Sequence, residues 1–413
     1  MTDTNDIAVL RDLAQQYMQI ATSPGMAQRR QLWKDHLSLR PTSPPIVLRF
    51  GMWNMWCREV FADSNMLCKD AFYRDWEREL RVMLFQAATG DDYVLEPWLV
   101  MRSVQARRGP GLWGLQAEHT HSDTEGGSWK FDSPIKEWSD LAKISPPPHV
   151  IDEEETRRQA NRLGEAIGAI LPIDIERGPV ATSFHSDISY WLAQLRGLEQ
   201  MMIDMYESPR ELHGLLAFLR DGILANQAAA EKAGDYSATS GQNQCCCYAD
   251  QTLPPAPMQY GVKRKQLWGF MAAQEFTLIS PAMHDEFLLQ YQLPILKHFG
   301  LVAYGCCEDL TEKITMLRQI PNLRIIAVTP RANVQRCAEQ IQADYVSSWR
   351  PNPTDMVSTH FDEARVRRII GEGLKAFRGG RMHINLKDVE TVQGQPERLA
   401  RWVQIVREEI AKA

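Results

Sequence analysis

The chain has 413 residues, more than most single domains, but one large barrel with a terminal extension accounts for this length. Its content of 44% hydrophobic and 24% charged residues is that of an ordinary soluble globular protein. The net charge of −6 argues against a general binder of nucleic acid or of anionic membranes. We therefore expect a small molecule or another protein as the partner.

The N-terminal residues have neither the basic start nor the apolar block of a secretory signal, and no apolar run approaches the length of a membrane span. The eight cysteines include the adjacent groups 245–247 and 306–307. The triplet 245–247 lacks the two-residue spacer of a structural zinc site, so we interpret it as a buried cluster. A chain of this size folds without disulfide bonds, and we expect reduced thiols and a cytoplasmic protein.

The first part of the chain contains a helical extension and an irregular insertion. Residues 6–39 have helical periodicity and end at the proline-rich segment 41–45, which predicts an N-terminal helical extension over residues 1–45. Extended runs at 46–50 and 94–104 flank a periodic helix at 75–85. Residues 105–150, at about these limits, are rich in Gly, Trp, Ser, Asp and Pro, which is typical of a functional cover or an inserted hairpin.

From residue 153 onward, short apolar runs alternate with helical patterns. The expected strands are 173–177, 267–272, 301–304, 323–328, 345–348 and 382–386, and the expected helices are 153–170, 192–206, 209–232, 281–299, 310–320, 332–341 and 363–377. Such alternation predicts a parallel sheet. Roughly seven or eight such units favour an α/β fold, a (β/α)8 TIM barrel over residues 46–413 with the insertion at about 105–150. No dinucleotide fingerprint or P-loop is present.

In such a barrel the active site lies at the carboxyl ends of the strands. Cys306, Cys307 and Glu308 follow one strand directly, and soft thiolates with a carboxylate could hold zinc. Adjacent side chains diverge on an extended backbone, so one of the two cysteines could instead be a small buried hydrophobe. His383 is a third candidate zinc ligand, or else a hydrogen-bonded structural histidine.

Other polar residues near strand ends suggest acid–base chemistry and anion binding. Glu275 lies close in sequence to Trp268 and Phe270, and an apolar setting would raise its pKa; the alternative is a capping or surface glutamate. Arg350 could clamp a carboxylate through two hydrogen bonds or simply pair with an acid of the barrel, and Arg177 is a second candidate anion clamp. The further candidates for substrate binding are Trp268, Asn352, Lys387 and Trp53.

Several segments carry motifs of a known superfamily. MYESPRELHGLL lies within residues 195–222, ISPAMHDEFLLQYQLPIL within 267–300, YGCCEDL is 304–310, and ADYVSSWRPNP is 343–353. They resemble the uroporphyrinogen decarboxylase superfamily, including its branch of corrinoid-linked methyltransferases. The resemblance covers roughly residues 160–410 and implies a (β/α)8 barrel. In the methyltransferase branch a His-x-Cys motif supplies two zinc ligands; Cys306 matches the cysteine, and Tyr304 stands in place of the histidine.

The resemblance implies a methyltransferase that moves a methyl group from a small O-methylated donor to a separate corrinoid protein. Glu275 or Glu308 would then protonate the departing oxygen, Cys306 would be a zinc ligand, and Tyr304 is a further catalytic candidate. The chain has no D-x-H-x-x-G corrinoid signature, so cobalamin would arrive on the partner protein. A homodimer is also allowed, whereas nucleic acid and membranes are not expected partners. A lyase such as a decarboxylase of a small carboxylate, and a non-catalytic binding barrel, remain as alternatives.

Overall fold

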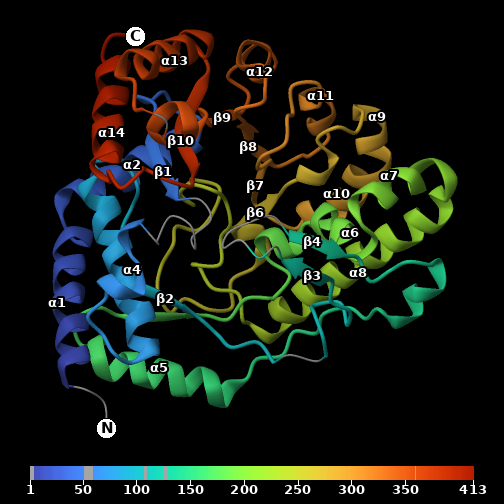
Figure 1. Cartoon of the computed structure of the whole chain (residues 1–413), viewed down its shortest axis with the longest axis horizontal. Coiled ribbons are helices and arrows are strands. Elements are labelled where there is room, and N and C mark those ends of the chain that lie inside the picture. The colour runs from blue at the N-terminus through green and yellow to red at the C-terminus, as the bar shows by residue number, and fades with distance from the viewer. Residues whose placement is uncertain (1–3, 51–58, 107–108, 122, 124–128, 359) are drawn as a thin grey trace.

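Six parallel strands form the main sheet of the protein. The computed structural model describes residues 4–50, 59–106, 109–121, 123, 129–358 and 360–413 (Figure 1). The strand order in this sheet is β1-β10-β9-β8-β7-β6. The strands are β1 (Ile46–Phe50), β6 (Trp268–Met271), β7 (Leu301–Tyr304), β8 (Leu323–Val328), β9 (Val346–Trp349) and β10 (Arg381–Val389). The sheet forms a half-barrel with helices on its outer side.

A second, two-stranded parallel sheet pairs β2 (Leu99–Arg102) with β5 (Ile173–Glu176). The segment 237–242 lies between this pair and the main sheet. The hydroxyl of Ser240 donates to Glu176 at the end of β5 over 2.9 Å, and the Gln242 amide donates to the carbonyl of Trp268 in β6 over 3.1 Å. This irregular segment therefore bridges β5 and β6 in space through hydrogen bonds to both.

The strands of the main sheet present two different faces. One face gathers small and medium apolar side chains, Val47, Ala303 and Ile325 among them, around Trp33 and Leu37 of the N-terminal region. The other face, which includes Val302, Ile326 and Ile384, packs against the surrounding helices. Both faces of each strand are buried, as expected for parallel strands covered by helices. The alternation decides which side chains can reach the interior of the half-barrel.

The expected N-terminal helix of residues 6–39 is two helices, α1 (Thr4–Ala21) and α2 (Pro24–Leu37). Pro24 cannot donate a backbone hydrogen bond, and it begins a new helix at the position where proline is tolerated. Helix α1 packs against α4 (Ala71–Ala88) and α5 (Glu153–Ile167). Helix α2 supplies Trp33 and Leu37 to the inner face of the strands, so its apolar side closes the interior of the half-barrel.

Most helices of the second half occupy the expected places. Their bounds are α6 (Ile188–Arg196), α7 (Leu198–Glu207), α8 (Pro209–Ala233), α9 (Pro281–His284), α10 (Gln290–Leu296), α11 (Ile314–Leu317), α12 (Val334–Ile341), α13 (Glu363–Ala376) and α14 (Glu397–Ile410). The expected helix 192–206 is interrupted at Gly197, whose φ of 92° is not helical. A π-helical turn at residues 285–289 separates α9 from α10. Helix α14 has no counterpart among the expected elements.

The insertion at about 105–150 contains an antiparallel hairpin of β3 (Glu118–His121) and β4 (Trp129–Asp132). It is anchored by Trp113, which is fully buried and packs closely over Gly222 of α8. Trp138 is partly buried, with the guanidinium of Arg196 4.4 Å from its ring centroid. The insertion is thus part of the packed structure, and the expected hairpin is confirmed.

None of the helices in the described part of the chain is both long enough and apolar enough to cross a lipid bilayer.

Candidate functional site

Cys306 lies two residues beyond the carboxyl end of β7, on a turn that requires glycine. Gly305 has a φ of +101°, a conformation that residues with a side chain rarely adopt. A Cβ at this position would also lie 2.8 Å from Ala327 and from Leu310. The turn brings the sulfur atoms of Cys306 and Cys307 to 3.5 Å from each other. The two thiols therefore face one site, although adjacent side chains diverge on an extended backbone.

Lys387 of β10 brings an ammonium group to this pair. Its Nζ lies 3.2 Å from the sulfur of Cys306 and 3.6 Å from that of Cys307, and it also donates to Asp388 over 2.9 Å. Lys387 shares one face of β10 with His383 and Asn385, because side chains two apart on a strand point the same way. Met382, Ile384 and Leu386 on the other face pack among the helices. The lysine is thus held by its strand over the thiols.

The surroundings of Cys306 favour its thiolate. The pKa of Cys306 is lowered to about 6, first by the hydrogen bond with Cys307 and then by the positive charges of Lys387 and Arg350. Burial acts in the opposite direction and raises it. The pKa of Cys307 is raised, first by its hydrogen bond to Cys306 and then by burial. One proton is therefore shared by two sulfurs, and Cys306 is the group that gives up its proton first.

A small cavity opens onto the two thiols. It has a volume of about 360 Å³ and is lined by Cys306, Cys307, Pro330, Arg331, Arg350, Asn352, Pro353, Lys387 and Asp388. Three of these side chains are cations and one is a carboxylate. Arg350 donates to the carbonyl oxygens of Cys306 and Gly305, which fixes the guanidinium beside the turn. The cavity suits a small molecule that carries negative charge.

Buried polar atoms without a hydrogen-bond partner in the described structure gather near the same turn. They are the Nε of Arg350, the Oδ1 of Asn385, and the Oε1 and Nε2 of Gln244. The side-chain amide of Asn385 donates to the backbone carbonyl of Gln244 over 3.3 Å, and Gln244 also favours the thiolate of Cys306. Buried polar atoms are normally paired, so unpaired ones beside a nucleophile are typical of a binding site.

A cluster of carboxyl groups lies next to the turn. Glu308 is buried and accepts hydrogen bonds from the backbone amides of Cys306 and Ala273, each over 2.8 Å. The hydroxyl of Ser189 lies 2.9 Å from Asp187 and 2.6 Å from Glu275. Because one hydroxyl carries one hydrogen, both contacts are hydrogen bonds only if a carboxyl group is protonated.

The pKa values of this carboxyl pair agree with a retained proton. Burial raises the pKa of Asp187 well above its ordinary value, and the charge of Glu275 adds to the effect. Burial likewise raises the pKa of Glu275, against the hydrogen bond from Ser189. The direction of the shift for Glu275 agrees with the expectation, and its catalytic role stays a prediction. Asp187 and Glu275 together hold a proton more readily than isolated carboxyl groups do.

The side chains around Cys306 do not fit a zinc ion. Zinc needs three or four ligands, and the described residues contain no group of three or more His, Cys, Asp and Glu side chains placed to hold a metal. The ammonium of Lys387 contacts both sulfurs. His383 is also unsuited, since one ring nitrogen contacts His36 at 3.2 Å and the other contacts Ser348 at 2.8 Å. The expected zinc set is therefore not assembled.

A larger cavity of about 640 Å³ lies against the insertion. Its lining includes residues that follow β2 and β5, namely Gln105 and Val180, and the aromatic pair Tyr190 and Trp191 of α6. The described residues that line it include no Asp, Glu, Lys or Arg. This cavity is therefore far less charged than the one at Cys306.

Comparison with known proteins finds likeness among solved structures. No family model matches the chain, and no curated protein matches it. Among solved structures, the chain is similar to a methyltransferase from Methanosarcina mazei, with 13% sequence identity and a TM-score of 0.46. The likeness covers 92% of this chain and 97% of that chain. At this identity and TM-score it bears on neither the reaction nor the substrate.

The structure brings together several of the residues expected at the site. Arg350, Asn352 and Lys387 line the cavity with Cys306 and Cys307. Glu308 stabilises the same turn by accepting hydrogen bonds from the backbone amides of Cys306 and Ala273. These residues follow or lie near the carboxyl ends of β7, β9 and β10 in the main sheet, as the rule for parallel barrels predicts.

Two expected site residues lie elsewhere. Tyr304 is buried among the helices, where its hydroxyl donates to Gln292 over 2.7 Å and contacts His284 at 3.0 Å. It shares the helix-covered face of β7 with Val302, whereas Cys306 lies beyond the strand, after the turn at Gly305, and belongs to the inner cluster. Trp268 is the first residue of β6 and is buried in the same cluster as Trp33, on the inner face. The placement of Tyr304 does not agree with a catalytic role at Cys306, whereas Trp268 lies in the same inner cluster as Cys306 without lining its cavity, and its substrate-binding role stays a prediction.

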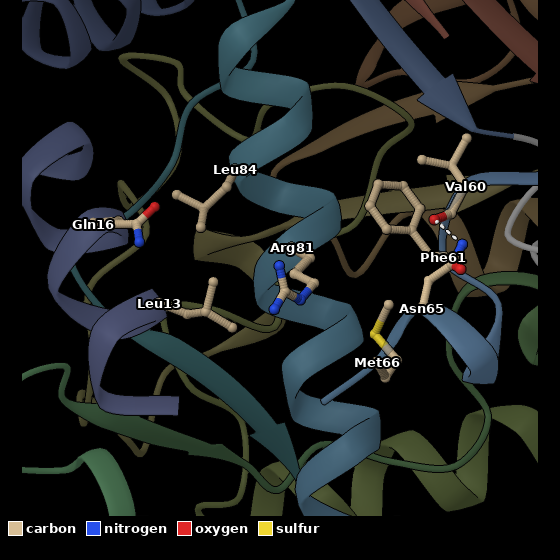
Figure 2. Close-up of a pocket in the computed structure, with 8 residues that line it drawn as sticks. All are labelled: Leu13, Gln16, Val60, Phe61, Asn65, Met66, Arg81 and Leu84. Carbon is tan, nitrogen blue, oxygen red and sulfur yellow. Dashed lines mark hydrogen bonds between the residues drawn. The ribbon is translucent and has the colours of Figure 1, made fainter. Parts of the chain in front are cut away.

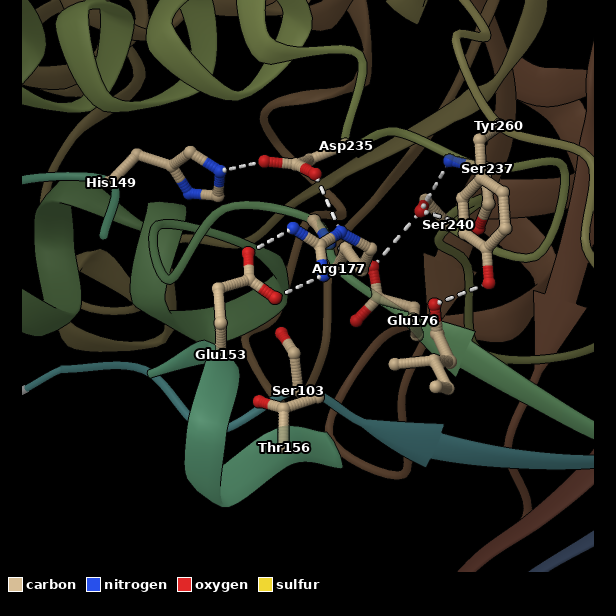
Figure 3. Close-up of polar contacts among 12 residues, drawn as sticks. Ser103, His149, Glu153, Thr156, Glu176, Arg177, Asp235, Ser237, Ser240 and Tyr260 are labelled. Carbon is tan, nitrogen blue, oxygen red and sulfur yellow. Dashed lines mark hydrogen bonds and ion pairs between the residues drawn. The ribbon is translucent and has the colours of Figure 1, made fainter. Parts of the chain in front are cut away.

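Arg177 is not available as an anion clamp. Its guanidinium donates to Asp235 over 2.7 Å and to both carboxylate oxygens of Glu153, over 2.9 and 2.5 Å (Figure 3). Asp235 also contacts His149 of the insertion at 2.8 Å. The arginine therefore joins the end of β5 to α5 and to the insertion, and the expected role of Arg177 in substrate binding does not agree with this placement.

Trp53 lies outside the described residues. Close to it in the chain, Val60 and Phe61 border a hollow of about 290 Å³ between α1 and α4 (Figure 2). Arg81 is a charged side chain of that hollow, and its guanidinium is bound by Glu77 over 2.8 Å. This hollow holds no nucleophile among its lining residues and carries no candidate chemistry.

Several residues near the site were not anticipated, among them Arg331 in the lining of the cavity. Asn385 could have been predicted from the sequence, because it lies two residues from His383 and two from Lys387 on one strand and therefore shares their face. Asp187 and Ser189 lie at the start of α6, where a short polar sequence is normally interpreted as a helix cap; Asp187 does cap this helix. Gln244 belongs to the irregular segment before β6, whose path cannot be derived from periodicity.

Proposed function

We propose that this chain is a methyltransferase that acts through the thiolate of Cys306. The observation that carries the proposal is a thiol of lowered pKa, held by Lys387 and Cys307 at the end of a parallel strand, in a small cavity lined by cations. A thiolate is a strong nucleophile toward saturated carbon, whereas a neutral thiol is not. The donor we propose is a small carboxylate that carries a methoxy group, and Arg331 and Arg350 would bind its negatively charged carboxylate.

Two displacements would complete the transfer. In the first, the sulfur of Cys306 forms a bond to the methyl carbon while the carbon–oxygen bond breaks, and the departing oxygen takes a proton from the ammonium of Lys387. In the second, a nucleophile of the acceptor takes the methyl group from sulfur, and Cys306 leaves as a thiolate. The groups that lower the pKa of Cys306 also make its sulfur a better leaving group. Lys387 regains its proton from solvent.

We propose the reduced cobalt of a corrinoid, carried by a separate protein, as the acceptor. This part depends on the resemblance of residues 267–300 and 304–310 to the corrinoid-linked branch. We also infer that the half-barrel and the β2–β5 pair are arcs of one closed (β/α)8 barrel. Two contacts support closure: the segment 237–242 bonds to both β5 and β6, and the Asp92 amide donates to Ile46 of β1 over 2.7 Å.

A lyase acting on a small carboxylate is the second candidate, because of the carboxyl pair. Asp187 and Glu275 can retain a proton beside Ser189, and such a proton could be delivered to the carbanion left when carbon dioxide departs. In this reaction Cys306 would have no covalent role. The two candidates therefore differ in what happens to the sulfur.

The test incubates the protein with methoxyacetate or a methoxybenzoate, with and without added cob(I)alamin. Methyl transfer predicts methylcobalamin and the free hydroxy acid as products, and, without the acceptor, a methyl group on the tryptic peptide 298–313 that contains Cys306 and Cys307. A lyase predicts release of carbon dioxide and no change in that peptide.

Matched variants make the outcome decisive. Cys306→Ser should abolish transfer, whereas Cys337→Ser, which changes a buried cysteine of α12, should leave the rate unchanged. Full activity in Cys306→Ser would overturn the covalent route. Failure of every O-methylated carboxylate to methylate cob(I)alamin would overturn the methyltransferase proposal.

A further inference from the structure

Cys306 and Cys307 are positioned for a reaction with each other. Their sulfur atoms are 3.5 Å apart, and the positive φ of Gly305 produces the turn that directs both toward the cavity. We propose that this pair is an oxidative modification site, at which a hydroperoxide converts the two thiols into a disulfide between adjacent residues. The proposal concerns the thiols themselves and does not depend on methyl transfer.

The two cysteines have the complementary properties that such a reaction needs. Cys306 is the cysteine that forms a thiolate, which the ammonium of Lys387 at 3.2 Å stabilises. Only a thiolate attacks the peroxide oxygen. Cys307 keeps its proton until Cys306 has reacted, because its pKa is raised by its contact with Cys306. Cys306 is therefore the residue that is oxidised first, and Cys307 is the resolving thiol.

A small oxidant can reach the pair. Cys306 is only 2% exposed, but it lines the 360 Å³ cavity, and Cys307 is exposed at the surface. Cys245, Cys246 and Cys247 differ, since burial raises the pKa of each thiol. Reaction with peroxide should therefore select the pair 306–307 over this triplet.

The atoms balance in two steps. The Cys306 thiolate attacks one oxygen of hydrogen peroxide, the oxygen–oxygen bond breaks, and sulfenic acid forms with loss of hydroxide, which takes a proton to become water. The sulfur of Cys307 then displaces the hydroxyl group from Cys306, and the proton of Cys307 leaves with it as a second water. Peroxide is reduced and the two thiols are oxidised by two electrons.

The product should be easily reduced. Cα atoms joined by a trans peptide bond are 3.8 Å apart, below the separation of about 4.4–6.8 Å that relaxed disulfides adopt. Strained disulfides have higher reduction potentials and are readily reversed by thiols. Oxidation would remove the thiolate from beside Lys387, so reversible loss of the methyl transfer proposed above is a consequence that rests on that proposal.

The experiment uses the full-length protein, hydrogen peroxide and mass spectrometry without any methyl donor. Trypsin releases residues 298–313, a peptide whose only cysteines are Cys306 and Cys307. After peroxide this peptide should be two hydrogens lighter, and dithiothreitol should restore its mass. In Cys307→Ser the reaction should stop at a sulfenic acid that dimedone traps. In Cys306→Ser the peptide should remain unmodified under the same conditions.

Cys337→Ser is the matched control, and its peptide 298–313 should lose two hydrogens as in the unchanged protein. A wild-type peptide that gains oxygen without losing hydrogens, or that stays reduced at a peroxide concentration that oxidises the triplet 245–247, would overturn the proposal. The wild-type mass decides the matter even if a serine variant does not fold. Because no methyl donor is present, failure here is distinct from failure of the proposed reaction.

Discussion

The ammonium nitrogen of Lys387 lies 3.2 Å from the sulfur of Cys306, although 81 residues separate them in the chain. The two side chains come from β10 and from the turn after β7, and strands β8 and β9 lie between these strands in the sheet. The contact places a positive charge at the candidate nucleophile. Its removal gives the most direct test of how the site works.

Lys387→Met should raise the pKa of the Cys306 thiol. The measurement is the rate of alkylation by iodoacetamide against pH, followed on the peptide 298–313. In the unchanged protein the rate should rise through a midpoint of about 6, and in the variant the midpoint should move toward the ordinary value of about 8.5. Lys387→Arg keeps the charge and should shift the midpoint less. An identical profile for Lys387→Met would show that the lysine does not stabilise the thiolate.

Gly305→Ala should destabilise the protein by at least about 2 kcal/mol, because the new Cβ combines an unfavourable φ with contacts of 2.8 Å to Ala327 and Leu310. Urea unfolding gives the change in free energy. Gly371→Ala is the matched control, since that glycine lies within α13 with open space around it, and alanine should stabilise the helix by about 0.5–1 kcal/mol. Equal effects of the two substitutions would contradict the requirement for glycine at the turn.

His284 should make the protein sensitive to acid. Tyr304 donates to Gln292, so the Nε2 of His284 is the donor in its contact with Tyr304, and the ring is neutral. Burial lowers the pKa of His284 to about 3, with a smaller contribution from Lys313. The unfolded chain takes up a proton near pH 6.5 and the folded protein does not, so stability falls as pH decreases from about 6.5 toward 3.

The measurement compares urea unfolding at about pH 7.5 and about pH 5. Between these values His284 alone should cost about 2 kcal/mol, so in His284→Phe the difference between the two stabilities should shrink by about that amount. The comparison of differences removes the contribution of other buried histidines such as His36, which the variant retains. An unchanged difference would mean that the pKa of His284 is the same in the folded and unfolded states.

Arg177→Met should lower stability and leave any small carboxylate substrate bound as before. The substitution removes the cation that pairs Asp235, which is 9% exposed, and the expected cost is about 1–3 kcal/mol in urea unfolding. Arg158→Met removes an exposed pair with Glu155 on α5 and should cause no measurable change. A large rise in KM with unchanged stability would instead restore Arg177 to the site as an anion clamp.

The sequence by itself determined the order of strands and helices between residues 153 and 386, without the last helix α14, and the strand ends that carry Cys306, Arg350 and Lys387. These features depend on hydrophobic periodicity, which is local. Only the tertiary structure decided which of the polar residues meet. Arg177 lies at a strand end as expected, yet Glu153 and Asp235 occupy it, and Tyr304 faces the helices.

The same limit explains the chemistry of Cys306. Two adjacent cysteines and a distant lysine are unremarkable in a sequence, and their side chains would diverge on an extended strand. The positive φ of Gly305 and the pairing of β10 within the sheet bring two sulfurs and one ammonium together. A pKa depends on distances of a few ångströms between residues that can be far apart in the chain. The sequence alone therefore could not predict that the pKa of Cys306 is lowered.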